Sequence, residues 1–245
     1  MTARLSVIIP LLNERRTIAS VIRECYALDH EAEIVVVANG TTDGSAEIAR
    51  RCGATVISYD RPLGHDVGRS VGARRSSGEV LLFVDGDIVI PAAMLRPFVE
   101  TAMAGADIVL NDYSGPVHLK HAHDVVVAKH VLNVALGRAD LRGMSLSAVP
   151  HAMRRSAAER IGYEHLAVPP LAHAMAVYHG LRIQAGPRVP VGRLNPLRSH
   201  RRNGDPTGRL MLGDHLEALD WLLRQTGERG NRHDYGRRRN EVSGS

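Results

Sequence analysis

The first third of the chain alternates short apolar runs with segments of helical periodicity, and this alternation limits the possible fold most strongly. The apolar runs, which we predict to be strands, cover residues 5–9, 34–37, 55–57 and 80–84. Between them, apolar side chains recur every three or four residues, as expected of helices. Runs that are apolar throughout are typical of parallel strands buried on both faces. The pattern predicts an α/β fold, a three-layer sandwich with a mainly parallel central sheet.

Polar residues follow three of the predicted strands. Asn13 and Glu14 come soon after the first strand, and Asn39 comes at the end of the second. Asp85 and Asp87 follow the fourth. Ligands of open α/β sheets bind beyond the carboxyl ends of the strands. We therefore expect these side chains to gather at one edge of the sheet and to line a ligand site there.

Asp85 and Asp87, separated only by Gly86, suggest a metal site. Two carboxylates so close repel each other unless a positive charge lies beside them. Mg²⁺ and Mn²⁺ prefer oxygen ligands, and such ions bind through one or two carboxylates together with substrate phosphates. The small Gly86 leaves room for a ligand near the backbone. A turn capped by the two aspartates is the alternative, and these three residues alone do not decide between the two.

The rest of the chain is less regular. We predict helices near residues 95–102, 124–136, 156–161, 171–178 and 212–223, and strands near 108–110 and 181–184. His151 is predicted to lie in a loop, and the proline-, arginine- and glycine-containing residues 187–206 to form a mobile loop. Residues 228–245 are polar and charged, so we expect a disordered tail.

The composition of the chain limits the kinds of ligand and partner that we expect. No apolar run reaches the roughly 18 residues of a membrane span, although peripheral contact with a membrane stays open. The net charge of +5 suits anionic small molecules, whereas an aromatic content of 4% leaves few platforms for base stacking. We therefore expect no nucleic-acid partner. The start of the chain shows no signal-peptide pattern, and the two cysteines are far apart, so a reducing cytoplasm is expected.

Three blocks in the first 100 residues carry a family resemblance. They read "LSVIIPLLNERRTIASVI", "EIVVVANGTTDGSAEIARRCGATVI" and "GHDVGRSVGARRSSGEVLLFVDGDIVIP". In this order they resemble family 2 glycosyltransferases, with the likeness strongest over residues 5–100. The resemblance implies a GT-A (Rossmann-like) fold, a nucleotide-sugar donor and a metal-dependent glycosyl transfer with Mg²⁺ or Mn²⁺. It also implies a donor-binding half at residues 1–110 and an acceptor-binding half of the same domain at residues 111–227.

The resemblance assigns roles to individual positions. Asp87 would bind the metal, and Asp85, beside Gly86, would reach the ribose or the metal shell. Asn39 would face the nucleobase. The base and ribose would be bordered by Pro10, Leu11, Asn13 and Glu14. The diphosphate would be bordered by Gly64, His65 and Arg69. Ala38 and Ser70 depart from the residues usual in the family, which are Asp and Asn.

The catalytic base expected of an inverting family member is missing. Pro169 and Pro170 stand where an acidic pair is usual, and neither can accept a proton. Histidine and carboxylate side chains elsewhere are candidates for this role. The candidates are His151, Asp214 and His215, with His173, Glu164 and Asp112 as further options.

Several functions stay open at this point. We favour a transferase that uses a UDP-sugar, and the basic segment 188–209 favours a polar or anionic acceptor. The alternatives are a retaining GT-A enzyme of the glucosyl-phosphoglycerate synthase type and a nucleotide-binding protein without transferase activity. A nucleotidyltransferase is disfavoured because "PLLNERR" lacks a glycine-rich phosphate loop. The sequence does not indicate an oligomeric state.

Overall fold

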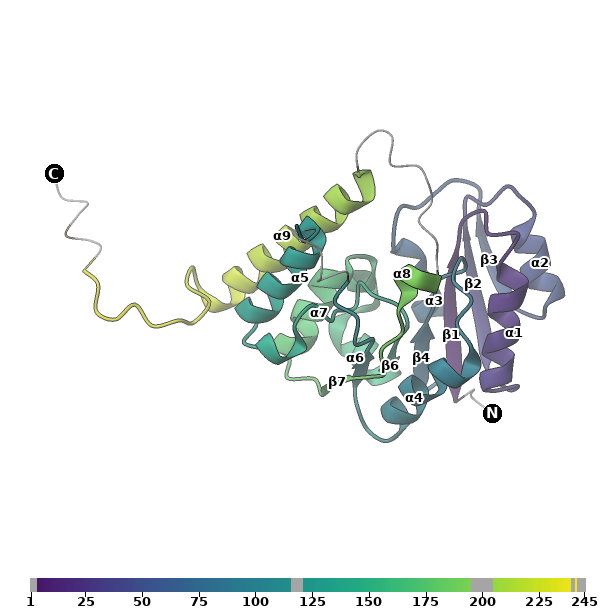
Figure 1. Ribbon diagram of the computed structural model, residues 1–245, viewed down its shortest axis with the longest axis horizontal. Helices are drawn as coiled ribbons and strands as arrows, with labels where there is room; N and C mark the ends of the chain where they lie inside the picture. Colours follow the sequence, from purple (N-terminus) through teal and green to yellow (C-terminus); the bar gives the residue numbers. More distant parts are fainter. Residues whose placement is uncertain (1–3, 116–120, 195–204, 239–240, 242–245) are drawn as a thin grey trace.

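A mostly parallel β-sheet lies at the centre of the computed structural model, which describes residues 4–115, 121–194, 205–238 and 241 (Figure 1). The described strands form one seven-stranded sheet in the order β3-β2-β1-β4-β6-β5-β7. They are β1 Leu5–Leu11, β2 Glu33–Asn39, β3 Thr55–Tyr59, β4 Val80–Phe83, β5 Ile108–Leu110, β6 His151–Arg154 and β7 Ile183–Ala185. This arrangement confirms the predicted α/β class with a mainly parallel sheet.

Strand β6 is the exception to the parallel order, and it corrects one prediction. It runs antiparallel to both β4 and β5, with His151 opposite Phe83. The prediction of a loop around His151 is therefore wrong. The four residues His-Ala-Met-Arg contain no β-branched side chain, so no local signal marks them as a strand. Their extended state depends on backbone pairing with two strands that are distant in the sequence.

Helices cover both faces of the sheet. On one face lie α1 (Ile18–Leu28), α2 (Ser45–Arg51) and α4 (Ala92–Met103), and on the other α3 (Val67–Arg75), α6 (Arg155–Ile161) and α7 (Pro169–Tyr178). Alternate residues of β1 enter the two cores, since Val7 and Ile9 join one and Ile8 joins the other. This burial on both faces is the reason that Ser6 is the one polar residue of the strand. The predicted three layers are present.

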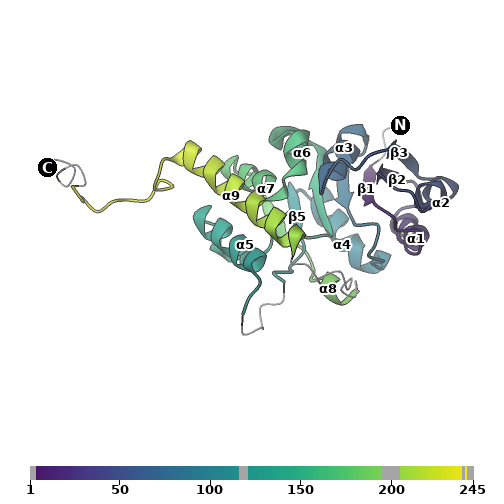
Figure 2. The same ribbon diagram turned by 90° about the horizontal axis from the view of Figure 1, so that it is seen from above.

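Two further helices pack beyond the sheet. Helices α5 (Asp124–Ala135) and α9 (Pro206–Thr226) lie side by side, and both contact α7 through a small apolar core (Figure 2). The residues that precede the two helices are joined by the 2.7 Å pair between His123 Nε2 and Asp205 Oδ2. Two 3-10 turns, Ala139–Leu141 and Tyr163–Ala167, and the short helix α8 (Val191–Leu194) complete the described elements.

The predictions of a mobile loop and of a disordered tail in the second half of the chain have different outcomes. The segment predicted as a mobile loop contains α8, so that prediction is wrong for residues 191–194, whereas residues 195–204 lie outside the described residues. The disordered tail stays a prediction. Among the described helices, none has the length and apolar character needed to cross a membrane.

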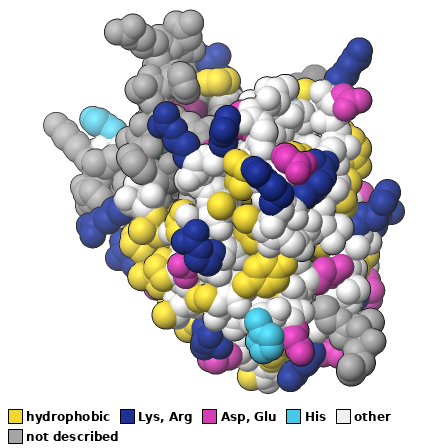
Figure 3. Space-filling model, turned by 90° about the vertical axis from the view of Figure 1, so that its right-hand side faces the viewer, with side chains coloured by type: hydrophobic (Ala, Val, Ile, Leu, Met, Phe, Trp, Pro, Cys, Tyr) yellow, Lys and Arg dark blue, Asp and Glu magenta, His cyan; other side chains and the backbone are white. Residues whose placement is uncertain are grey.

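Basic side chains are dispersed over one face of the molecule (Figure 3). On the face drawn in Figure 3, Lys and Arg side chains alternate with acidic and apolar ones and do not form a continuous stripe. A stripe of positive charge is the feature expected of a nucleic-acid-binding surface. This face therefore gives no support to a nucleic-acid partner.

Candidate functional site

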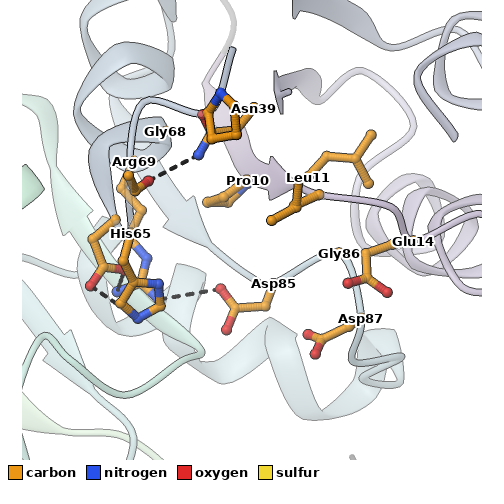
Figure 4. Close-up of a pocket in the computed structure, with 14 residues that line it drawn as sticks. Pro10, Leu11, Glu14, Asn39, His65, Gly68, Arg69, Asp85, Gly86 and Asp87 are labelled. Atoms are coloured by element: carbon orange, nitrogen blue, oxygen red, sulfur yellow. Dashed lines mark hydrogen bonds and ion pairs between the residues drawn. The ribbon is translucent and has the colours of Figure 1, made fainter. Parts of the chain in front are cut away.

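A pocket of about 390 Å³ opens beyond the carboxyl ends of β1, β2 and β4 (Figure 4). Its lining comprises Pro10, Leu11, Leu12, Glu14, Asn39, Pro62, Gly64, His65, Asp66, Gly68, Arg69, Asp85, Gly86 and Asp87. All of the predicted donor-site positions except Asn13 are among these residues. The structure thus brings together side chains that are up to about 80 positions apart in the sequence, at the edge where a parallel sheet binds ligands.

The segment after β4 is held tightly against the end of β1. The hydroxyl of Thr17, which precedes α1, donates a 2.7 Å hydrogen bond to the carbonyl of Gly86. A Cβ atom on Gly86 would lie 3.1 Å from the carbonyl oxygen of Pro10 and 3.2 Å from Cδ1 of Leu11. A side chain at this position would therefore press on β1. Glycine allows the two aspartates on either side of it to lie close to the first strand.

Arg69 supplies positive charge to the pocket. It is only 5% exposed, and its guanidinium pairs with Asp66 at 3.1 Å and with Asp85 at 3.2 Å. Burial alone lowers the pKa of Arg69, but the two carboxylates outweigh it and the net shift is upward. The guanidinium also donates to the carbonyl of Leu146 at 3.4 Å. Asp85 is therefore oriented by a fixed cation.

Asp66 is a site residue that the sequence reasoning missed. It has a positive φ of 61° and precedes α3, three positions before Arg69. An acid three residues before an arginine at the start of a helix is a recognisable pairing signal. His65 lies beside it, with Nε2 3.6 Å from Asp66 Oδ2. His65 also lines the pocket.

Asn39 lines the pocket, but both ends of its amide are used by backbone groups. Its Nδ2 donates to the carbonyl of Gly64 at 2.9 Å, and its Oδ1 accepts from the N–H of Leu63. These bonds hold residues 63–64 against the end of β2. The expected role of Asn39 in facing a nucleobase stays a prediction, and it would compete with these two bonds.

The side chain of Asn13 forms a hydrogen bond within the loops beside the pocket. Its Oδ1 accepts a 2.9 Å hydrogen bond from the N–H of Thr42, and the hydroxyl of Thr41 donates to the carbonyl of Leu11. These contacts join the segments that follow β1 and β2. Asn13 itself does not line the pocket, so its contact with base or ribose stays a prediction that this arrangement does not favour.

The carboxylates suit a divalent cation that is shared with a ligand. Among the described residues, no cluster of three or more His, Cys, Asp or Glu side chains could hold a metal on its own. Asp85 and Asp87 both line the pocket, and carboxylate oxygens are the kind of ligand that Mg²⁺ and Mn²⁺ prefer. The remaining coordination positions would belong to phosphate oxygens and water, which is the usual way Mg²⁺ is bound beside a phosphorylated substrate.

Three of the candidate bases are buried. His151 is 2% exposed, stacks on Phe83 with ring centroids 4.8 Å apart, and pairs through Nδ1 with the carbonyl of Ala148. Burial, followed by the charge of Arg69, lowers the pKa of His151 to about 3. His173 and His215 are also buried, and burial lowers the pKa of each, in His173 to about 3. None of the three lines the pocket.

Asp214 has a more suitable position, in the first half of α9. Burial raises the pKa of its carboxyl group, and the charges of Asp66 and Glu217 raise it further, whereas His65 lowers it. Asp66 and His65, whose charges act on Asp214, both line the pocket. A carboxylate with a raised pKa is a better proton acceptor near neutral pH.

The two prolines have a structural explanation. Pro169 and Pro170 form the first turn of α7, where the missing N–H groups would have no partner within the helix. Both are buried. They begin a helix that packs against α9, and they supply no proton acceptor.

The fold and the pocket define the class of the protein. A mostly parallel sheet flanked by helices, with paired aspartates at the carboxyl end of a central strand, is the arrangement of GT-A glycosyltransferases. Residues 6–116 match the family model "Glycosyl transferase family 2". The expected family resemblance is thereby confirmed.

Curated relatives share the matched region. The undecaprenyl-phosphate 4-deoxy-4-formamido-L-arabinose transferase of Pseudomonas syringae pv. syringae (strain B728a) is 29% identical over 114 residues, which are 42% of this chain and 34% of the relative. The enzyme of the same name from Pseudomonas aeruginosa (strain LESB58) is 32% identical over the same coverage. The match thus spans about a third of the length of these relatives.

Solved structures share the fold over most of the chain. Glucosyl-3-phosphoglycerate synthase from Mycobacterium tuberculosis, in complex with Mn²⁺, UDP and phosphoglyceric acid, has a TM-score of 0.64 and 20% identity. That match covers 92% of this chain and 79% of the synthase. Mannosyl-3-phosphoglycerate synthase from Rubrobacter xylanophilus has a TM-score of 0.64 and 19% identity, over 96% and 78%. At these identities the likeness shows the fold alone.

Proposed function

We propose that the chain transfers a sugar from a nucleoside-diphosphate sugar, with a UDP-sugar favoured, in a reaction that depends on Mg²⁺ or Mn²⁺. One observation carries the proposal. Two carboxylates, Asp85 and Asp87, and a buried guanidinium, Arg69, line a single pocket at the carboxyl ends of the strands. Carboxylates suit the metal, and the guanidinium adds positive charge for a diphosphate.

The solved neighbours support the choice of donor. Glucosyl-3-phosphoglycerate synthase was crystallised with Mn²⁺ and UDP, and also with Mn²⁺ and UDP-glucose. The similar fold makes UDP the first nucleotide to test. The two free cysteines, Cys25 and Cys52, accord with a reaction in the cytoplasm.

Each pocket residue has a defined task in this proposal. Asp87 and Asp85 would hold the cation, which when bound supplies Lewis-acid stabilisation of the diphosphate leaving group. Arg69 keeps Asp85 in place and adds positive charge at the pocket wall. His65 stands at the pocket wall, where it can donate a hydrogen bond to a phosphate oxygen.

Whether the transfer inverts or retains the anomeric configuration depends on which residue could act as the catalytic base. An inverting reaction needs a group to accept the proton of the acceptor hydroxyl, and Asp214 is the best-placed candidate in α9. A retaining reaction of the glucosyl-phosphoglycerate synthase type is the second candidate. It is favoured by the burial of His151, His173 and His215 and by the use of Pro169 and Pro170 to begin α7.

The test combines binding and turnover. Calorimetry of UDP with and without Mn²⁺ should show binding that depends on the metal, and incubation with UDP-sugars should release UDP slowly by hydrolysis. Binding without any hydrolysis or transfer would favour the nucleotide-binding protein that lacks transferase activity. If UDP, GDP and ADP all fail to bind in the presence of Mn²⁺, the proposal is wrong.

A further inference from the structure

One arginine at the wall of the pocket binds two carboxylates at once. Nη1 of Arg69 lies 3.1 Å from Oδ1 of Asp66, and Nη2 lies 3.2 Å from Oδ1 of Asp85. The guanidinium also donates to the carbonyl of Leu146 at 3.4 Å. Since the two carboxylates use different nitrogens, neither displaces the other. Arg69 therefore links Asp66 to a carboxylate that the proposed function assigns to the cation.

The two carboxylates differ in their exposure to water. The side chains of Asp66 and Arg69 are 7% and 6% exposed, whereas the side chain of Asp85 is 32% exposed. Asp66 and Arg69 thus form an internal ion pair, and each charge needs the other because little water can solvate it. Asp85 is the exposed member of the group and faces the pocket (Figure 4). A ligand can therefore reach Asp85 while the pair behind it stays intact.

The backbone holds Asp66 in this position. Its φ of 61° lies in the left-handed region, at the residue that precedes α3. Apart from glycine, aspartate and asparagine are the residues that adopt this conformation most readily. The N–H of Arg69 donates to the carbonyl of Asp66 at 2.9 Å, so a single turn of chain brings the two side chains together. The chain itself, and not a ligand, sets the position of this carboxylate.

The second carboxylate changes the charge that a cation meets at Asp85. A guanidinium bound to one carboxylate forms a pair with no net charge. With Asp66 on its other nitrogen, one positive and two negative charges leave the group with a net charge of −1. Because Asp66 is held inside, the excess negative charge is available at the exposed member, Asp85. A divalent cation is attracted to such a group and would gain much less from a neutral pair.

We propose that Asp66 is a positioning residue of the cation site, which acts through Arg69. It neutralises the guanidinium that orients Asp85, so that Asp85 is held by a cation and keeps its negative charge for Mg²⁺ or Mn²⁺. This inference rests on the proposed function in one respect, that the metal binds at Asp85. Metal binding can be measured without the transfer reaction, so the two can fail separately.

The first experiment measures Mn²⁺ binding to Asp66→Asn. Asparagine has the shape of aspartate, tolerates the left-handed backbone and keeps an oxygen that can accept from Arg69, but it lacks the charge. The affinity for Mn²⁺, followed by electron paramagnetic resonance with and without UDP, should fall roughly ten- to a hundredfold. Circular dichroism checks the fold. An unchanged affinity for Mn²⁺ would overturn the proposal.

Asp107→Asn is the matched control. Asp107 is also a carboxylate paired with an arginine, since its Oδ2 lies 3.3 Å from Nε of Arg182. It directly precedes β5, which runs parallel to β4 and begins at the edge of the sheet opposite the pocket. The two variants remove the same charge from the protein, so a difference between them reflects the position of Asp66. The affinity of Asp107→Asn for Mn²⁺ should equal that of the wild type.

Binding of UDP without metal separates an electrostatic role of Asp66 from a structural one. In Asp66→Asn the pocket loses one negative charge and repels a diphosphate less, so the metal-free affinity for UDP should stay equal or rise. A collapsed pocket would bind both ligands more weakly. A loss of metal-free UDP affinity together with the loss of Mn²⁺ affinity would make Asp66 a structural residue, and the proposal would be wrong.

A measurement on the wild type guards against a variant that does not fold. When diamagnetic Mg²⁺ binds, the guanidinium protons of Arg69 should remain slow to exchange in NMR spectra, because Asp66 and the carbonyl of Leu146 still hold them. Fast exchange in the Mg²⁺-bound protein would contradict the proposal.

The outcomes distinguish this inference from the proposed function. If UDP does not bind but Mn²⁺ does, and Asp66→Asn weakens Mn²⁺ binding, the proposed function fails and this inference stands. If UDP and Mn²⁺ bind to Asp66→Asn as they bind to the wild type, the proposed function stands and this inference fails. If the wild type binds no Mn²⁺ with or without UDP, this inference is wrong.

Discussion

The pocket beyond β1, β2 and β4 and the helical region formed by α5, α7 and α9 differ in how their polar side chains are paired. At the pocket, Asp66 and Asp85 both pair with Arg69. Between the outer helices, His173 and His215 are buried, and His173 Nδ1 and His215 Nε2 have no hydrogen-bond partner among the described residues. The charged groups of the pocket are thus held in fixed pairs, whereas the outer helices enclose polar atoms without a partner in the part of the chain that the structure describes.

The largest expected effect concerns the pocket. Asp87→Ala should abolish metal-dependent UDP binding while the protein stays folded, because in the proposed function Asp87 would supply a carboxylate oxygen to the cation in the pocket. Calorimetry with UDP and Mn²⁺ measures this, with circular dichroism as the check of folding.

Glu47→Gln is the matched control for that variant. Glu47 is an exposed carboxylate on α2, and its loss should leave UDP binding unchanged. Wild-type affinity for UDP and Mn²⁺ in Asp87→Ala would show that the metal is held elsewhere. The contrast between the two regions would then lose its main support.

The next prediction tests whether the outer helices contribute to chemistry. If transfer is inverting, Asp214→Asn should lower turnover by about a hundred- to ten-thousand-fold without weakening UDP binding. Steady-state kinetics and the product anomer, read by proton NMR, give the answer. A product that retains the donor's anomeric configuration, with nearly full activity in the variant, would remove Asp214 from the role of base. An inverted product with full activity would place the base on a residue that we have not named.

A smaller effect is expected from His151. Its pKa is about 3 in the folded protein, against an ordinary value near 6.5, so the unfolded chain binds an additional proton between these values. The free energy of unfolding should therefore fall as the pH drops through this range, by about 1.4 kcal/mol per pH unit from this residue. His151→Phe should reduce that slope.

Urea unfolding at pH 7, 6 and 5 measures the slope for His151. His30→Gln, at an exposed position, is the control and should leave the slope unchanged. An identical slope in the wild type and in His151→Phe would mean that His151 is protonated in the folded protein, and would remove the argument that burial disqualifies it as a base.

The smallest expected effect distinguishes two roles of Asn39. Because its amide binds the backbone of Leu63 and Gly64, Asn39→Ala should cost about 1–3 kcal/mol of stability. UDP and ADP affinities should then fall by similar factors, since the loop that carries the pocket wall is loosened. If Asn39 instead reads the base, UDP affinity alone should fall. The ratio of the two dissociation constants decides between these outcomes.

Parts of the fold could be predicted because the physical cause is local. Burial of β1 on both faces favours a mainly apolar run, and residues 5–9, in which Ser6 is the one polar residue, show it directly. Strand β6 could not be found in this way, because its extended state depends on pairing with β4 and β5.

The site shows the same division between local and distant causes. The sequence placed Asn39 at a strand end, but its amide partners lie 24 and 25 positions further on, so its orientation could not be predicted. The pairing of Asp66 with Arg69 has a local signal, whereas the pairing of Arg69 with Asp85 joins positions 16 apart and depends on how α3 packs against the sheet.

The antiparallel position of β6 has a consequence for synthesis of the chain. β4 is bordered by β1 on one side and by β6 on the other, and β6 begins only at His151. While a ribosome is still adding the residues before His151, one edge of β4 presents unpaired backbone groups, a template for contact with other nascent chains. A fragment of residues 1–110 would keep that edge permanently. We therefore expect it to aggregate when expressed alone, although it contains every residue that lines the pocket.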